Sequence, residues 1–235
     1  ALDKGYHVNG TLRDIEKQDR ITRLKSLPSG NNAKFFQADM AEISSLDHPL
    51  INSDAAIICC LIPTYKGFDG TPAKELDDER GYNEIIKPTV DGCLNILKSA
   101  KINNVKNILI CSSTSSTNPI PPVLVKNELD HWSDEKEQCN SKKYTSAAKT
   151  YMERAAFKFC NENNLRLSVF LPTGLYGPAI LPEHLKHNPF LWIKSVLEGG
   201  PPRHQKVPND SASLIHLQDL AKLFLAAYEN PSASG

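Results

Sequence analysis

Short runs with a β-strand pattern alternate along this chain with longer segments that have a helical pattern of polar and apolar residues. The short runs lie at residues 6–12, 34–38, 54–62, 105–113 and 165–172. The third run is apolar throughout, which is typical of a strand buried on both faces of a sheet. The intervening segments predict helices at residues 14–27, 72–101 and 143–162.

The order of these elements predicts the fold class. Strands that alternate with helices are connected by right-handed crossovers and pair in parallel. The chain is therefore expected to be an α/β protein with a Rossmann-like, doubly wound parallel sheet.

The pattern changes after Pro172. Residues 178–210 are rich in proline and have few long apolar runs, which predicts a loop-rich segment. A strand at 212–217 and a last helix, capped by Asp219, are expected to follow. We therefore divide the chain after residue 177 into a main domain and a small C-terminal substrate lobe that ends at residue 235.

Charge and composition argue against several kinds of partner. Lysine and arginine together number 27, and so do aspartate and glutamate, so no overall field favours nucleic acid. The longest apolar run, AAIICCLI, is too short to cross a bilayer, and the first residues do not resemble a signal peptide. A cytoplasmic protein with no nucleic-acid or membrane partner is expected.

Cysteine and histidine do not form a metal-binding pattern. The six cysteines include no CxxC pair, and His184, His187 and His204 lack the spacing of metal ligands. We expect no metal site.

The first strand ends at a position that has a special role in dinucleotide-binding folds. There, the residue at the end of the second strand reads the ribose 2′ position, about 20 residues after a glycine-rich loop. Arg13 occupies the end of strand 6–12, but it lies too close to Ala1 for such a loop to precede it. We therefore interpret this strand as the second of the fold and expect the first strand and glycine loop upstream of Ala1.

Arginine at this position indicates which cofactor is bound. An acidic residue accepts hydrogen bonds from a 2′-hydroxyl, whereas a guanidinium matches a 2′-phosphate in charge and shape. Arg13, with Arg20 as a second cation, therefore predicts NADP(H). The alternative is that both arginines are solvated surface charges.

Several segments, in this order and spacing, resemble the dihydroflavonol reductase / cinnamoyl-CoA reductase family of extended short-chain dehydrogenases. The resemblance runs almost from end to end of the chain. The segments that carry it are GYHVNGTLRD, QADM, EIIKPTVDGCLNILKSA, VKNILICSS, HWSD, KTYMERAAFKF, LPTGLYGP and YENPSASG. In the family the last of these runs on into another strand, so we expect the chain to be truncated at both ends.

The resemblance implies roles for individual residues. Asp39 and Met40 would contact the adenine, and Pro172 would lie in the turn beside the nicotinamide. Ser113 would be the catalytic serine and Lys149 the catalytic lysine, which also binds the nicotinamide ribose.

A carbonyl reductase must deliver a hydride to carbon and a proton to oxygen. The proton donor is usually a tyrosine, whose pKa of about 10 is lowered by a neighbouring lysine, while a serine orients the carbonyl oxygen. Ser113 lies where a parallel strand ends, the usual place for functional residues in such a sheet. Ser112 and Thr114 are possible substitutes, and the serine-rich segment is alternatively a simple polar exit from the strand.

The candidate tyrosine departs from the family spacing. The family has Y-x-x-x-K, whereas Tyr144 precedes Lys149 by five residues, which on a regular helix leaves the two side chains about 140° apart. Thr145 stands four residues before the lysine, and Tyr151 cannot substitute. Three alternatives remain: a π-bulge at residues 146–148, a Tyr144 that lies just before the helix, or a broken catalytic triad.

These features predict an NADPH-dependent reductase of a small aldehyde, ketone or thioester, with Ser113, Tyr144 and Lys149 as the catalytic residues. One alternative is an NADP-binding regulatory protein with impaired catalysis, which the tyrosine spacing favours. Another is a sugar-nucleotide epimerase or dehydratase of the same superfamily. The expected partner is a small carbonyl substrate, and helices 84–100 and 143–162 could pair two subunits in a homodimer.

Overall fold

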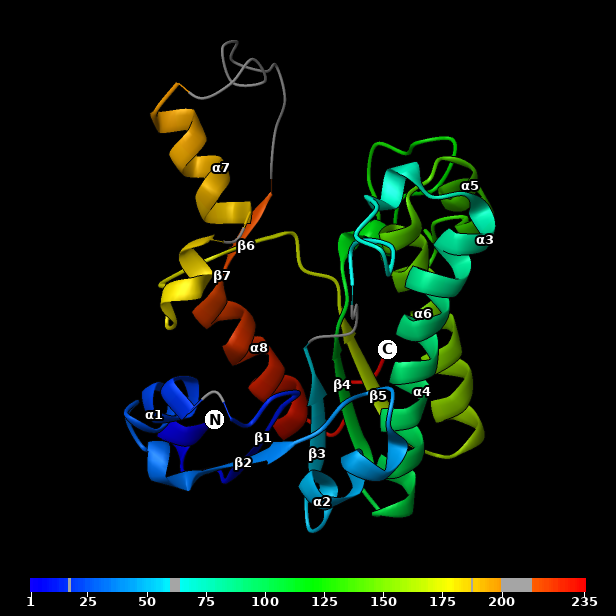
Figure 1. Ribbon diagram of the computed structural model, residues 1–235. Helices are drawn as coiled ribbons and strands as arrows, with labels where there is room; N and C mark the ends of the chain where they lie inside the picture. Colours follow the sequence, from blue (N-terminus) through cyan, green and yellow to red (C-terminus); the bar gives the residue numbers. More distant parts are fainter. Residues whose placement is uncertain (17, 60–63, 187, 200–212) are drawn as a thin grey trace.

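The chain has a Rossmann-like α/β fold, as predicted, with parallel strands and covering helices (Figure 1). The computed structural model describes residues 1–16, 18–59, 64–186, 188–199 and 213–235. The described strands are β1 (Val8–Leu12), β2 (Ala33–Gln37), β3 (Ala55–Ile58), β4 (Asn107–Cys111), β5 (Arg166–Phe170), β6 (Gly174–Tyr176) and β7 (Leu214–His216).

All of the described strand pairs are parallel, but they form three separate groups. β1 pairs with β2, β6 pairs with β7, and β3, β4 and β5 form a sheet in that order. In the three-stranded sheet Ile58 is opposite Ile110, and Cys111 is opposite Phe170. The carboxyl ends of these strands therefore meet at one edge, which is where open α/β sheets bind ligands.

Helices cover both faces of the three-stranded sheet. The α-helices are α1 (Gln18–Lys25), α2 (Asp47–Leu50), α3 (Asp78–Gly81), α4 (Lys87–Ile102), α5 (Glu135–Asn140), α6 (Tyr144–Glu162), α7 (Asn188–Leu197) and α8 (Leu217–Glu229). α4 and α6 pack on one face, and α8 packs on the other (Figure 1). Among the described residues, no helix combines the length and apolarity that spanning a membrane requires.

The central strand β4 shows why the sheet is buried on both sides. Ile108 and Ile110 belong to the core that includes α4 and α6, whereas Leu109 packs with Leu220 and Phe224 of α8. Successive side chains of a strand point to opposite faces, so a continuous apolar run is needed to fill both layers. Each of the three β4 side chains is at most 1% exposed, and this burial stabilises the sheet by roughly 1.5–3 kcal/mol per side chain.

Most predicted elements are present with shorter bounds, but three predictions need correction. The helix predicted from residue 72 begins at Asp78, where Asp77 caps the first turn by accepting a hydrogen bond from the backbone of Arg80. It then passes through a π-helical turn, η5 (Tyr82–Ile86), before α4. The segment predicted to be loop-rich, residues 178–210, contains α7, and α5 and β6 were not predicted.

The cap predicted for the last helix is also wrong. His216, not Asp219, precedes the first turn of α8, and its ring accepts a hydrogen bond from the backbone of Gln218. Asp219 instead lies within the first turn, where a negative charge favours the helix dipole. Part of the strand predicted at 212–217 is present as β7, and residue 212 lies outside the described residues.

Candidate active site

A polar cavity of about 580 Å³ opens at the carboxyl ends of β4 and β5. Its volume is in the range of small-molecule sites. Hydroxyl and amide groups from separate segments converge there: Ser113, Thr114, Thr117, Asn118, Thr173 and Ser213. Pro172 also lines the cavity, and its carbonyl accepts a hydrogen bond from the backbone of Thr114 at 3.4 Å.

The strand exit distinguishes between the two adjacent serines. Ser113 lies on the cavity wall and begins a 3₁₀ turn, in which its side-chain oxygen accepts a hydrogen bond from the backbone of Ser115 at 3.2 Å. Ser112 is only 6% exposed and donates its hydroxyl to Glu153 of α6. Of these two, Ser113 is therefore the one that can meet a molecule in the cavity.

Lys149 lies on α6, next to the carboxyl end of β4. Its ammonium donates to the carbonyl of Cys111 at 3.4 Å, the last residue of β4. Glu153, one helical turn further on, is 2% exposed, and burial raises the pKa of its carboxyl. The charge of Lys149 and the hydrogen bond from Ser112 act against this rise. Lys149 and Glu153 thus support the strand that carries Ser113.

Tyr144 lies elsewhere. Its side chain is completely buried among Leu76, Ile85 and Ile86. Its hydroxyl donates to a carboxylate oxygen of Asp78 at 2.7 Å. Burial and this hydrogen bond raise the pKa of Tyr144 to about 12. A phenol in this environment is a weaker acid than free tyrosine, which is the opposite of what proton donation requires.

α6 is a regular α-helix over the segment that separates Tyr144 from Lys149. Tyr144 is its first residue, so neither the π-bulge at 146–148 nor a tyrosine outside the helix is observed. The helical irregularity is found instead in η5, directly after Gly81, whose backbone is in contact with the Tyr144 ring. The structure therefore does not bring the predicted phenol and ammonium together.

A second cavity, of about 970 Å³, contains three predicted nucleotide-binding residues: Arg13, Asp39 and Met40. It lies between the facing edges of β1 and β3, which belong to different sheets and are not hydrogen-bonded to each other. Figure 1 shows the β1–β2 pair apart from the three-stranded sheet. On the sides that face this gap, β1 and β3 pair with no described strand.

The three residues occupy different settings at this cavity. Arg13 is exposed and makes no ion pair with a described residue, so its guanidinium is free to meet an anion. Asp39 stabilises its own turn by accepting a hydrogen bond from the backbone of Ala41 at 2.9 Å. Met40 packs against Gly92, and its carbonyl accepts a hydrogen bond from Asn95 at 3.0 Å.

Arg20 is not directed to the same place as Arg13. It forms an ion pair with Glu183 at 2.6 Å. Glu183 belongs to the 3₁₀ turn η7 (Pro182–Lys186) in the C-terminal part of the chain. This contact joins α1 to that turn, and a phosphate would have to compete with Glu183 for the guanidinium.

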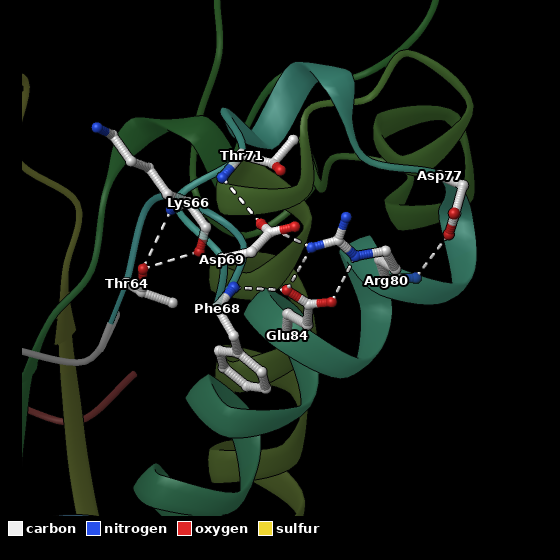
Figure 2. Close-up of polar contacts among 8 residues, drawn as sticks. All are labelled: Thr64, Lys66, Phe68, Asp69, Thr71, Asp77, Arg80 and Glu84. Atoms are coloured by element: carbon white, nitrogen blue, oxygen red, sulfur yellow. Dashed lines mark hydrogen bonds and ion pairs between the residues drawn. The ribbon is translucent and has the colours of Figure 1, made fainter.

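The loop after β3 is held by a cluster of charged groups (Figure 2). Arg80 pairs with Asp69 at 2.9 Å and with Glu84 at 2.6 Å. Glu84 also accepts a hydrogen bond from the backbone of Phe68 at 2.6 Å. The hydrogen bond from Arg80 is the main cause of the lowered pKa of Glu84. This cluster fixes the segment around Phe68 and Asp69, which follows β3.

Two charged residues of the polar cavity were not predicted from the sequence. Lys126 and Glu128 line it from the segment between β4 and α5, and Lys126 donates to Asn118. Their position in the sequence could have identified them, because a long segment that follows a parallel strand lies at the ligand-binding edge of the sheet. Tyr144 and Lys149 are not among the described residues that line either cavity.

Known proteins resemble this chain over its whole length. Dihydroflavonol 4-reductase from Callistephus chinensis is 30% identical over 240 residues, which cover 100% of this chain and 62% of that enzyme. Anthocyanidin reductase ((2S)-flavan-3-ol-forming) from Vitis vinifera is 26% identical over 243 residues, or 69% of its length. The chain thus spans about three-fifths of the dihydroflavonol reductases it matches, 61% of that from Gerbera hybrida.

Solved structures support the fold. Yeast methylglyoxal/isovaleraldehyde reductase complexed with NADPH matches with a TM-score of 0.76 at 21% identity, covering 100% of this chain and 70% of that one. Vestitone reductase from alfalfa matches with a TM-score of 0.71 at 21% identity, covering 100% and 68%. The model of the NAD dependent epimerase/dehydratase family matches residues 2–235. The chain therefore belongs to the NAD dependent epimerase/dehydratase family.

Proposed function

We propose that this protein is an NADP(H)-dependent oxidoreductase that acts on the carbonyl group of a small aldehyde, ketone or thioester. The observation that carries the proposal is the position of Ser113, on the wall of a polar cavity at the carboxyl ends of β4 and β5. The names of the relatives support the same class, because they are reductases. Lys149, beneath the end of β4, supplies the nearby positive charge.

The described residues fit the adenosine half of the cofactor. Arg13 would bind a 2′-phosphate, since it is exposed at the cavity and makes no ion pair there. Asp39 and Met40, at the same cavity, would contact the adenine.

The roles of the remaining residues follow from their positions. The cofactor supplies a hydride when bound. The Ser113 hydroxyl would donate a hydrogen bond to the substrate carbonyl oxygen and hold it for reduction. Lys149 would stabilise negative charge and bind the nicotinamide ribose, and Pro172 would present backbone to the nicotinamide side of the cavity.

One observation favours a second candidate function. The Tyr144 hydroxyl is buried against Asp78 rather than directed to Lys149. Without a phenol beside the substrate carbonyl, the protein would bind NADP(H) but reduce carbonyls only slowly. The second candidate function is therefore an NADP-binding regulatory protein with impaired catalysis.

The experiment measures binding and turnover separately with the full-length protein. NADPH binding, followed by the change in its fluorescence, should be tighter than NADH binding and should weaken in Arg13→Ala. NADPH oxidation over a panel of carbonyl compounds should fall about 10²-fold or more in Ser113→Ala, because a preoriented donor is lost. Equal affinity for NADH and NADPH would rule out the role of Arg13, and absence of binding to either would rule out the proposed function.

A further inference from the structure

The start of α6 carries two hydroxyl groups on different sides of the helix. Tyr144 and Thr145 are neighbours, so their side chains diverge by about 100° around the axis. Thr145 precedes Lys149 by four residues, which places it on the same side as the lysine, one turn earlier. Lys149, on this side, contacts the end of β4, whereas the Tyr144 side contacts α3 and η5.

Three independent contacts hold the Tyr144 ring on its own side. A Cβ at position 81 would lie 2.5 Å from atoms of the ring, so the ring rests directly on the Gly81 backbone. The hydroxyl donates a hydrogen bond to the carboxylate of Asp78 at 2.7 Å and lies 3.4 Å from the carbonyl oxygen of Leu76. Ala147 and Ala148, both fully buried, close the same cluster. Turning the phenol toward Lys149 would break all of these contacts.

We propose that Tyr144 is a positioning residue, which locks the start of α6 onto α3 and the π-helical turn, and that the α6 side chain facing the reacting carbonyl is Thr145. This inference rests on the proposed function, because it concerns the reaction at the Ser113 cavity. An alkyl hydroxyl is a far weaker acid than a phenol and does not release a proton at neutral pH. The proton must therefore come from a group other than Thr145, either the Lys149 ammonium or water, and turnover is slow.

The balance of the reaction shows what is lacking. Reduction forms a C–H bond with a hydride and its electron pair from NADPH, which is left as NADP⁺, while the carbonyl π pair moves to oxygen. The oxygen then takes a proton. A phenol at position 145 would give that proton and recover it from solvent, with Lys149 stabilising the phenolate one turn away.

The test compares Thr145→Tyr with Thr145→Phe in the full-length protein, because the two new side chains differ only in the phenol hydroxyl. We expect NADPH oxidation with Thr145→Tyr to exceed that with Thr145→Phe by about 10²-fold or more, the usual contribution of a general acid. The Thr145→Tyr pH profile should also gain an alkaline limb that neither the parent protein nor Thr145→Phe shows.

Tyr144→Phe provides a second measurement that does not depend on the folding of the Thr145 variants. A positioning role predicts that the pH profile of turnover keeps its shape when the phenol hydroxyl is removed, although stability falls. Loss of an alkaline limb in Tyr144→Phe, with NADPH binding unchanged, would overturn the inference. Equal rates for folded, NADPH-binding Thr145→Tyr and Thr145→Phe would also overturn it. A parent protein that binds no NADPH would overturn the proposed function itself, and the inference with it.

Discussion

The two sides of α6 differ in what they allow chemically. On the side that faces β4, Lys149 and Glu153 are ionisable groups with polar partners, Cys111 and Ser112. On the other side, Tyr144 is enclosed by apolar side chains and fixed by one carboxylate. A group that exchanges protons with a substrate must be reachable. Lys149 is partly exposed, whereas Tyr144 is fully buried, so the Lys149 side is better suited to chemistry and the Tyr144 side to stability. One helix thus carries a chemical role and a stabilising role on different sides.

The largest expected effect concerns the closely packed side. Tyr144→Ala leaves a cavity against Gly81 and removes a buried hydrogen bond, so we expect the free energy of unfolding to fall by about 3–5 kcal/mol. Urea denaturation followed by circular dichroism measures the change.

Tyr82→Ala is the matched control, because this tyrosine lies in the adjacent π-helical turn and is 49% exposed. A change of no more than about 0.5 kcal/mol is expected there. Similar losses in both variants would show that Tyr144 is not the anchor of this side.

A smaller effect is expected on the polar side, where Glu153 is buried. Its folded-state pKa is raised above the usual value of 4.5, so the folded protein holds the proton more tightly than the unfolded chain. The stability from this difference is present below pH 4.5 and is lost as pH rises through the folded-state pKa. Glu153→Gln keeps a hydrogen-bonding group and removes the titration, so stability should depend less on pH between 4.5 and the folded-state pKa.

Thermal unfolding at several pH values tests this expectation. Glu162→Gln, on the same helix and with its side chain 61% exposed, is the control and should follow the parent protein. If Glu153→Gln and the parent protein lost stability in parallel as pH rises, another group would be responsible.

The fold could be predicted because each layer leaves a local pattern. The unbroken apolar run of β4 predicted burial on both faces, and Leu109 and Ile110 do pack on opposite sides. The separation of Tyr144 and Lys149 likewise follows from five steps along a regular helix. Local geometry alone was sufficient for these conclusions.

Contacts between distant segments could not be predicted in the same way. Whether Ser112 or Ser113 faces the cavity depends on Glu153, which lies on another element and holds the first of them. The choice among the three possibilities for Tyr144 depended on Asp78 and Gly81, and no local pattern links these residues to α6. The sequence places such groups on their elements, but the packing of the elements decides what each side chain touches.

The smallest expected effect lies at the nucleotide end, where Arg20 is paired with Glu183. If Arg20 joins Arg13 at a 2′-phosphate, the carboxylate competes with the cofactor. Glu183→Gln should then tighten NADPH binding by at most about fivefold, since exposed ion pairs are weak. NADH, which lacks the phosphate, should bind as before. Fluorescence titration at low salt measures both affinities, because added salt screens the contact.

Glu198→Gln is the control for this last prediction. Glu198 pairs with Lys194 at 3.9 Å in the same C-terminal part of the chain, so its substitution makes an equal change in net charge. Tighter NADPH binding in Glu183→Gln alone would assign Arg20 to the phosphate. Equal tightening in both variants would attribute the effect to net charge, because only a specific contact between Arg20 and the phosphate makes the removal of Glu183 differ from the removal of Glu198. Arg13 would then remain the proposed phosphate-binding residue.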